Sequence, residues 1–372
     1  MRQYSSAASI ARVCVLCGVF ASGCGSDSSA KGPSSGGAAG AGASSGSGGS
    51  SSGGTSAGGG AGGTGAVGGA SGGSGGGSTA VPTVGGCPVF TADDEWNRDV
   101  SQDPVDASWT QKVQALVGSK NIHPDYGSGG GSVLYGIPFN VVPATQPAVN
   151  VAFDWWPNES DPSPYPFPGP GTIAIEGGEP TNCSGDCHVL VVQQGSCALY
   201  EGYACEHQSD GWHCGNGAKW DLTKNSYGQR PKGWTSADAA GLPILPGLLR
   251  YDEVVAGAVE HALRFTLSCT MNKYVAPATH FAVPSGCQNE ANAPPMGLRV
   301  RLKADFDISS APPSAQVILT AMKKYGMILA DNGSDFYFQG EANPGWSNAE
   351  IAPLKQVPAS AFEVVSVPPL EP

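Results

Sequence analysis

The stretch HVLVVQQGSCALYEGYAC (residues 188–205) determines the fold class expected for this chain. Two runs rich in Val, Leu and Tyr flank Gly195-Ser196, which suit a two-residue turn between antiparallel strands. With that turn, Leu190 lies opposite Glu201. Since residues two apart share a face of a strand, one face carries His188, Leu190, Val192, Leu199, Glu201 and Tyr203. The stretch therefore predicts a β-hairpin with a histidine, a carboxylate and a tyrosine on one side.

Regular patterns outside this hairpin predict further strands and a few helices. Strands are expected at 132–142, 149–155, 172–178, 211–222 and 298–308, which hold apolar runs or alternating residues. Helices are expected at 108–118, 252–263 and 312–326, where apolar residues recur every three or four positions. Two last strands, MILADNG and DFYFQGE, flank an Asn-Gly turn, in which Asp331 is a turn residue. We expect a β-rich (α+β) fold, an antiparallel β-sandwich or jelly-roll-like head with a few peripheral helices.

The N-terminal residues have the features of an exported lipoprotein. Residues 1–23 combine positive charge with an apolar run too short to span a bilayer, and small residues then precede Cys24. This pattern resembles a bacterial lipobox, which implies cleavage before Cys24 and a lipid on its thiol. An ordinary signal peptide, with Cys24 free or paired, is the alternative. Gly25 replaces the Asp that marks inner-membrane retention in such lipoproteins, which favours the outer membrane or the cell surface.

Composition divides the rest of the chain into a tether and one folded body. Residues 24–86 are almost wholly Gly, Ser, Ala and Thr, so they cannot bury an apolar face and are predicted to form a disordered linker. Residues 87–372 have no second low-complexity linker and no internal repeat, which predicts a single globular β-rich domain.

The cysteine count supports an extracytoplasmic location. Of the eleven cysteines, two belong to the signal segment and Cys24 is the lipidation candidate, which leaves an even number for disulfides. Their pairing stays open at this level. A zinc site at Cys183, Cys187 and His188 is the alternative, but thiols in an oxidising compartment favour disulfides, so no metal is expected.

Charge and motifs exclude several functions. The net charge of −12 disfavours nucleic acid, whose phosphates need a dense Lys and Arg surface, and a lipid anchor is the only membrane contact expected. The chain has no Gly-rich phosphate loop, serine elbow or His-Glu-x-x-His motif, and we expect no cofactor. We expect a monomer.

Candidate catalytic residues come from the hairpin and the strand after it. Glu201 is the candidate acid/base or nucleophile, Asp221 the second carboxylate and His188 an assisting group. A solvated sheet face is the alternative interpretation. The candidate substrate-binding residues pair aromatic rings with polar groups, as a sugar site requires, and they are Asp154, Trp155, Trp156, Tyr203, Trp220 and His261. The tryptophans could equally belong to the core, and a histidine at a helix end could be a capping cation.

Three stretches resemble a family of secreted proteins from actinobacteria, myxobacteria and some fungi. They are PKGWTSADAAGLPILPGLLRYDEV with EHALRFT, PPMGLRVRLKADFDIS, and YGMILADNGSDFYFQGE. The resemblance covers nearly the whole head and implies one recurring module. The resemblance implies no activity and no catalytic residues for this chain.

These observations lead to two hypotheses. The first is an extracytoplasmic surface lipoprotein that cleaves a polysaccharide or glycan, by hydrolysis or elimination. The alternative is a non-catalytic glycan-binding or adhesive surface lipoprotein. An enzyme needs a cleft with carboxyl groups of perturbed pKa, whereas a binder needs an exposed row of aromatic residues.

Overall fold

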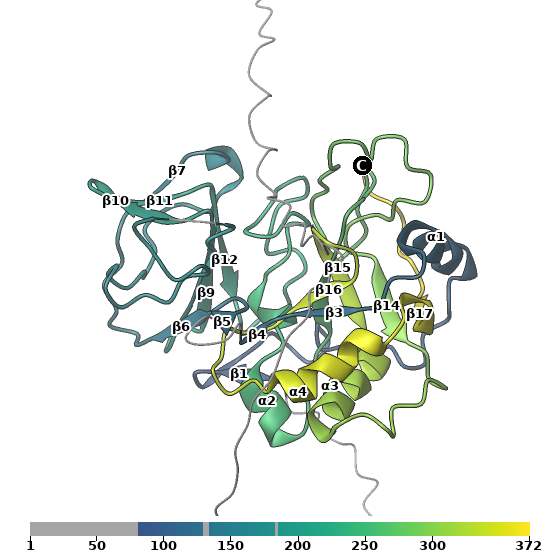
Figure 1. Ribbon diagram of the computed structural model, residues 1–372. Helices are drawn as coiled ribbons and strands as arrows, with labels where there is room; N and C mark the ends of the chain where they lie inside the picture. The colour runs from purple at the N-terminus through teal and green to yellow at the C-terminus, as the bar shows by residue number, and fades with distance from the viewer. Residues whose placement is uncertain (1–80, 129–133, 183–184) are drawn as a thin grey trace, which may run out of the picture. The chain divides into compact units, whose positions relative to one another are not determined.

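Two principal β-sheets carry the fold in the computed structural model, which describes residues 81–128, 134–182 and 185–372 (Figure 1). The larger sheet has six strands, in the order β17 (Phe362–Val364), β14 (Arg299–Leu302), β15 (Met327–Asn332), β13 (Leu263–Leu267), β16 (Tyr337–Gln339) and β3 (His123–Asp125). All described residues belong to one compact unit.

The second sheet contains the predicted hairpin. Its order is β12 (Asn216–Asp221), β9 (Ala198–Tyr203), β8 (Val189–Gln193) and β6 (Phe139–Val142). Leu190 pairs with Glu201 and Val192 with Leu199, so the register predicted from the Gly195-Ser196 turn is confirmed. Because that register is correct, the predicted face is correct too.

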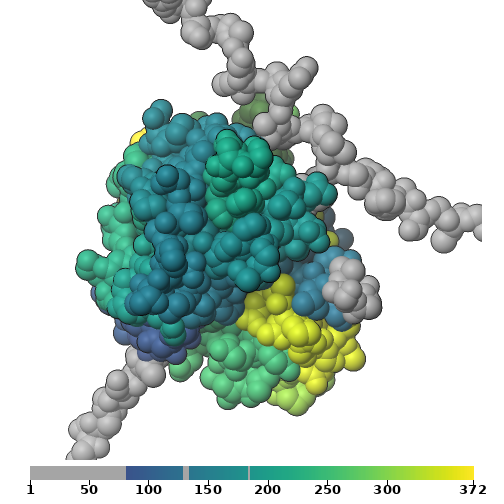
Figure 2. All heavy atoms as spheres, turned by 90° about the vertical axis from the view of Figure 1, so that its left-hand side faces the viewer, coloured from purple at the N-terminus to yellow at the C-terminus, as the bar shows by residue number. Residues whose placement is uncertain are grey.

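Three smaller sheets complete the β-structure of the described residues. Strands β10 (Glu206–Gln208), β11 (Gly211–Cys214) and β7 (Val151–Phe153) form one sheet, on the side of the molecule that faces the viewer in Figure 2. Strands β4 (Gly127–Ser128) and β5 (Leu134–Tyr135) form another. The third pairs β1 (Thr83–Val84) with β2 (Cys87–Pro88), so the fold begins a few residues before the predicted boundary at residue 87.

Helices are short and few, as the sequence predicted. The α-helices are α1 (Ala107–Val117), α2 (Tyr251–Ala256), α3 (Pro313–Lys324) and α4 (Asn348–Ile351). The 3-10 helices are η1 (Pro157–Glu159), η2 (Leu245–Gly247), η3 (Ala352–Gln356) and η4 (Ala359–Ala361). Asp106 caps the N-terminus of helix α1, because its side chain accepts a hydrogen bond from the Trp109 N–H, and helix α3 packs on β14. The β-rich class with a few helices is therefore confirmed.

The expected antiparallel arrangement is wrong in detail, because the sheets are mixed. Parallel pairs join β13 to β15, β16 to β3, β6 to β8 and β11 to β7. Strands β15 and β16 exist as predicted but do not form a hairpin, since β13 lies between them. The alternation of residues along a strand determines which face each residue occupies, but it does not determine which strand pairs with it.

Several predicted elements have different bounds or a different form. The strand expected at 132–142 is divided between β5 and β6, which belong to different sheets. Residues 172–178 are irregular, because the Asn140 side chain, rather than a strand, bonds the backbone of Ala174. Helix α2 ends at Gly257, which adopts a left-handed φ of 88°, so the predicted helix to 263 is too long. The expected strand 298–308 stops at Leu302. The expected strand 211–222 is divided at Gly215 between two sheets.

The predicted face of the hairpin lies in the main hydrophobic core. Leu190, Val192 and Leu199 are fully buried there together with residues of the six-stranded sheet. The opposite face, with Val189 and Val191, packs into a smaller second core. Both faces are therefore covered, which explains why β8 is an almost continuous apolar run.

Disulfides brace the described part of the head. Cys87 bonds Cys197, Cys205 bonds Cys214, and Cys269 bonds Cys287; Cys187 is also disulfide-bonded. Such bonds persist in a non-reducing, extracytoplasmic compartment, as the cysteine count predicted. Within the described ranges, the helices are all too short or too polar to cross a bilayer. The predicted signal segment, Cys24 and nearly all of the linker lie outside the described residues.

Candidate functional site

One face of the six-stranded sheet carries a row of polar side chains on three neighbouring strands. Tyr337 pairs with both Thr266 and His123, and Gln339 pairs with Asp125, so these residues share a face. Phe265 and Phe338 alternate with them and belong to the hydrophobic core. The polar row consists of His123, Asp125, Arg264, Thr266, Tyr337 and Gln339.

A β-bulge adds Asp331 to this polar face. The register between β13 and β15 shifts between Phe265 and Thr266, so Thr266 lies opposite Asp331. In an uninterrupted register Ala330 would lie opposite Thr266, and Asp331 would point to the other face. The extra residue therefore re-aims the carboxyl group towards Arg264, whose Nη2 lies 3.7 Å from Asp331 Oδ2.

Arg264 is neutralised by a buried carboxylate. Its Nε lies 3.0 Å from Asp238 Oδ2 and its Nη2 lies 2.5 Å from Asp238 Oδ1, and both side chains are buried. Burial, together with the negative charge of Asp238, holds the pKa of Asp331 well above its usual range. The charge of Arg264 opposes this rise, and Asp331 lies beside the fixed Arg264–Asp238 ion pair.

A second ion pair reaches the polar face from the neighbouring sheet. His188 Nδ1 lies 2.5 Å from Glu176 Oε2, and its Nε2 lies 3.1 Å from the carbonyl oxygen of Ala237. Burial opposes the charge of this imidazole, but the Glu176 carboxylate outweighs burial and raises the pKa of His188 to about 9. Burial opposes the charge of Glu176 too, yet His188 lowers its pKa below the usual value. At neutral pH the pair is a carboxylate held by an imidazolium.

Asp125 connects this cluster to the surface. Asp125 is exposed, but the protein atoms around it still remove part of its solvent, which raises the pKa of its carboxyl group; a hydrogen bond from Gln339 opposes this rise, and the negative charge of Glu176 adds to it. The pKa of Asp125 is thus raised, whereas the pKa of the neighbouring Glu176 is lowered. General acid/base chemistry uses carboxyl pairs whose pKa values differ in this direction, because the group with the higher pKa is the better proton donor and the other the better acceptor.

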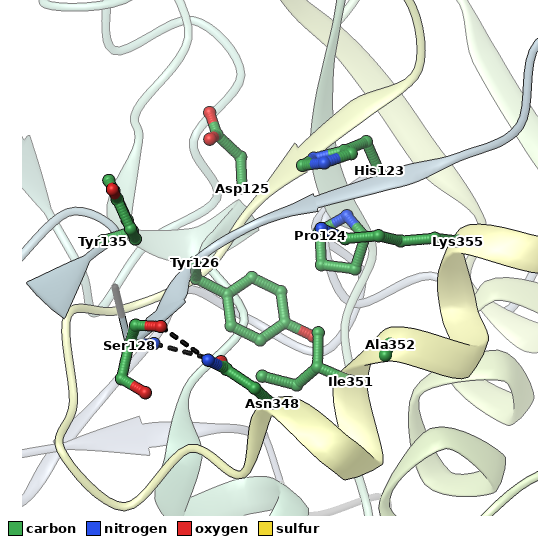
Figure 3. Close-up of a pocket in the computed structure, with 10 residues that line it drawn as sticks. All are labelled: His123, Pro124, Asp125, Tyr126, Ser128, Tyr135, Asn348, Ile351, Ala352 and Lys355. Carbon is green, nitrogen blue, oxygen red and sulfur yellow. Dashed lines mark hydrogen bonds between the residues drawn. The ribbon is translucent and has the colours of Figure 1, made fainter. Parts of the chain in front are cut away.

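A pocket of about 350 Å³ lies beside Asp125 (Figure 3). Its lining includes His123, Tyr135, Asn348 and Lys355. Asp125 points away from the Ser128–Asn348 hydrogen bonds at the far end of the group. The His123 and Tyr337 rings stack with centroids 4.1 Å apart and provide a flat, half-buried surface next to this carboxyl group.

Glu201 does not lie in this pocket. Its side chain is fully buried, and both carboxylate oxygens accept the Ile244 N–H at 3.0 Å, while Oε1 also accepts the Leu245 N–H at 2.9 Å. These donors begin the short helix η2, whose N-terminal N–H groups have no partners within the helix. Glu201 therefore joins β9 to the start of helix η2, and its carboxylate is buried away from solvent.

Asp221 and Trp220 do not join Glu201 in one site. Ala218 pairs with Glu201, so alternation along β12 places Trp220 on the same face and Asp221 on the opposite one. Asp221 binds Lys224 near the surface at 2.7 Å. Trp220 is buried in the main core and offers no platform for a sugar.

His261 also has a structural position. It is fully buried, and its Nε2 lies 3.0 Å from Glu253 Oε2, while Arg250 binds the same carboxylate. Burial opposes the charge of Glu253, but His261 and Arg250 together lower its pKa to about 2. Helix α2 ends at Ala256, so His261 is not at a helix end either; it is a buried partner of the Glu253 carboxylate.

The remaining predicted residues do lie together. Trp155 and Trp156 form an exposed pair that contacts Tyr203, and Asp154 binds His213 beside them. Tyr203 also contacts the ring of His188, which is the one predicted catalytic residue found in the acid/base cluster.

Five cluster residues were missed by the sequence reasoning: Asp125, Glu176, Asp238, Arg264 and Asp331. One available signal was the strand LRFTL (263–267), in which an arginine faces away from the apolar residues. From His123 onward, polar residues alternate with apolar ones in the same way. No local pattern marked Glu176, because it lies in an irregular segment.

Comparison of the chain with family models, curated proteins and solved structures found no match. The resemblance to the secreted family therefore stays a prediction.

Proposed function

We propose that this protein is an extracytoplasmic enzyme that cleaves glycosidic bonds by general acid/base catalysis at Asp125 and Glu176. The observation that carries the proposal is the carboxylate of Glu176, held by His188 at 2.5 Å, in one electrostatic cluster with the exposed Asp125, which lines a pocket of about 350 Å³. The pKa values of the two carboxyl groups are shifted in opposite directions, which supports it. Glycan cleavage requires such a pair, one group protonated and one ionised. The stacked His123 and Tyr337 rings beside Asp125 suit the flat C–H face of a sugar.

The residues take separate roles in this proposal. Asp125 donates its proton to the bridging oxygen as the bond between that oxygen and the anomeric carbon breaks. Glu176 accepts a proton from the water that attacks the same carbon, and exchange with solvent restores both groups. His188 is a positioning residue, because it fixes Glu176 and keeps it ionised. A supporting cluster of ionisable groups lies behind Asp125 and Glu176. It consists of Arg264, Asp238 and Asp331.

Glu176→Gln and Asp125→Asn test the catalytic pair on a library of polysaccharides. Either change is expected to lower turnover at least about a hundredfold, since each removes a group that moves a proton in the reaction. Asp305→Asn is the matched control, because it removes an equivalent carboxylate from an exposed loop. Full turnover in both site variants would remove this pair from the mechanism.

Mass spectrometry of the products separates the two reaction types. A gain of one water per cut indicates hydrolysis. A product with an unsaturated terminal sugar indicates elimination, in which Glu176 would take a proton from the sugar instead of from water. Absence of products from every glycan, with binding retained, would favour the non-catalytic alternative, which the exposed Trp155 and Trp156 pair supports.

We also propose that Cys24 carries the lipid that anchors the head at the outer membrane or cell surface. The lipobox-like sequence before Cys24 and the Gly/Ser-rich segment after it support this anchor. Intact-mass analysis of the native protein is expected to show a diacylglyceryl adduct at a new N-terminal Cys24. An unmodified N-terminus would exclude it.

A further inference from the structure

Two adjacent tryptophans are held rigidly at the surface. Trp155 is 49 % exposed and Trp156 40 % exposed, although such rings normally bury most of their area. The backbone N–H groups of both residues donate to the carbonyl oxygen of Gly215, at 3.2 and 2.9 Å. A Cβ at Gly215 would lie 2.6 Å from the Trp155 ring, so the ring packs directly on this glycine. The exposed pair is therefore a fixed feature of the fold.

Ring contacts lead from this exposed pair inward to the acid/base cluster, where His188 is buried. The ring centroids of Trp155 and Trp156 lie 5.7 and 6.3 Å from that of Tyr203. The Tyr203 ring lies 5.5 Å from that of His188, which binds Glu176. Tyr203 thus connects the tryptophans to the proposed base through a chain of ring contacts.

Hydrogen-bonding groups border the platform formed by Trp155, Trp156 and Tyr203. Asp154 Oδ2 lies 3.0 Å from His213 Nδ1, and Asp210 Oδ1 lies 3.2 Å from His213 Nε2. Asp154 and Asp210 are largely exposed, so their remaining lone pairs are available to hydroxyl groups. Flat aromatic faces edged by carboxylates match a sugar ring, which has an apolar C–H face and hydroxyl groups around its rim.

We infer that the platform of Trp155, Trp156 and Tyr203 binds sugar units of the same chain that is cut at Glu176 and Asp125. The substrate class is then a polysaccharide or long oligosaccharide that spans both places, cut within the chain rather than at its end. This inference rests on the proposed function, because it takes the carboxyl pair as the point of cleavage.

Binding is measured in the Glu176→Gln background, so that no cleavage interferes. The intact head is run on native gels that contain soluble β-glucan, xylan, galactomannan or pectin. Migration is expected to be retarded by one of these polymers, and Trp155→Ala or Trp156→Ala is expected to weaken that binding about tenfold, the equivalent of about 1.4 kcal/mol. Tyr227→Ala is the matched control, since Tyr227 is also a half-exposed aromatic residue but lies outside the platform.

Turnover distinguishes a failure of the platform from a failure of the catalytic pair. With Glu176 intact, the tryptophan variants are expected to raise KM for the polymer about tenfold, whereas Tyr227→Ala is expected to leave it unchanged. Equal binding of all tryptophan variants, or no retardation in any gel, overturns the platform. Unchanged turnover in Glu176→Gln overturns the catalytic pair and leaves the gel result for the platform standing.

Discussion

The imidazole of His188 holds the carboxylate of Glu176 through a 2.5 Å contact between Nδ1 and Oε2. His188 directly precedes β8, whereas Glu176 lies in an irregular segment whose own N–H bonds the His188 carbonyl oxygen. A side-chain contact and a backbone hydrogen bond thus both hold Glu176 against His188. The carboxylate proposed as the base is therefore held in place before any substrate arrives.

The first prediction concerns the dependence of stability on pH through His188. Its folded pKa of about 9 exceeds the value of 6.5 in an unfolded chain, so its stabilising effect is complete below pH 6.5 and is lost as pH rises through 9. The difference in unfolding free energy between the native protein and His188→Gln should therefore fall by about 3 kcal/mol between pH 6 and 9.5. Urea unfolding at four pH values measures it. A difference that stays constant with pH would show that His188 is neutral in the fold.

The second prediction concerns Glu201. Glu201→Ala leaves the buried N–H groups of Ile244 and Leu245 without their acceptor, which is expected to cost about 2–4 kcal/mol of stability. Thermal unfolding measures the loss, and the exposed Asp305→Ala provides the reference. A melting temperature within 1–2 °C of native (roughly the shift expected for well under 1 kcal/mol) would mean that the contact of Glu201 with the start of helix η2 contributes little to stability.

The third prediction concerns the pH dependence of stability through Glu201, which has the opposite sign to that of an ordinary carboxylate. Burial raises its pKa to about 7, so its contribution to stability is greatest below pH 4.5 and declines as pH rises through 7. Compared with Glu201→Gln, the native protein should lose about 3 kcal/mol of relative stability between pH 4.5 and 8. Relative stability that rises over that range would show that the backbone donors outweigh burial.

The fourth prediction compares two arginine–carboxylate pairs. Arg264→Lys cannot reproduce the two-point contact with the buried Asp238, so we expect a loss of about 3 kcal/mol. Arg98→Lys changes a half-exposed contact with Glu95 and Asp103 and should cost less than about 1 kcal/mol. Chemical unfolding of both variants at pH 7 makes the comparison. Equal losses would contradict the importance assigned to burial.

The fifth prediction concerns the disulfides and depends on loop length. The Cys87–Cys197 bond joins residues 110 apart, whereas Cys205–Cys214 joins residues 9 apart. The entropy of loop closure predicts losses of about 5 and 2.5 kcal/mol when the respective cysteine pairs are replaced by alanine. Unfolding midpoints of the two double variants test the order. A larger effect of the short loop would point to strain or packing in place of chain entropy.

Local patterns in the sequence predicted the hairpin register, helices α1 and α3, and the β-rich class. These features depend on interactions between residues that are close in the sequence, such as the Gly195-Ser196 turn and the alternation of β8 and β9. The identity of the strand next to β15 did not follow, because β13 pairs with it across a long stretch of chain. Likewise, Glu201 lies on the face of the hairpin that the sequence predicted. The sequence did not show that the backbone of Ile244 and Leu245 would cover its carboxylate.

By itself, the sequence determined which residues alternate, where turns fall, and that the cysteines are suited to an oxidising compartment. Only the tertiary structure decided which charges meet. Asp125, Glu176, Asp238 and Asp331 come from four distant segments, and a bulge in β15 together with an irregular segment before β8 turns two of them towards Arg264 and His188. The pKa values follow from burial and from distances between these groups, and both are properties of the folded chain.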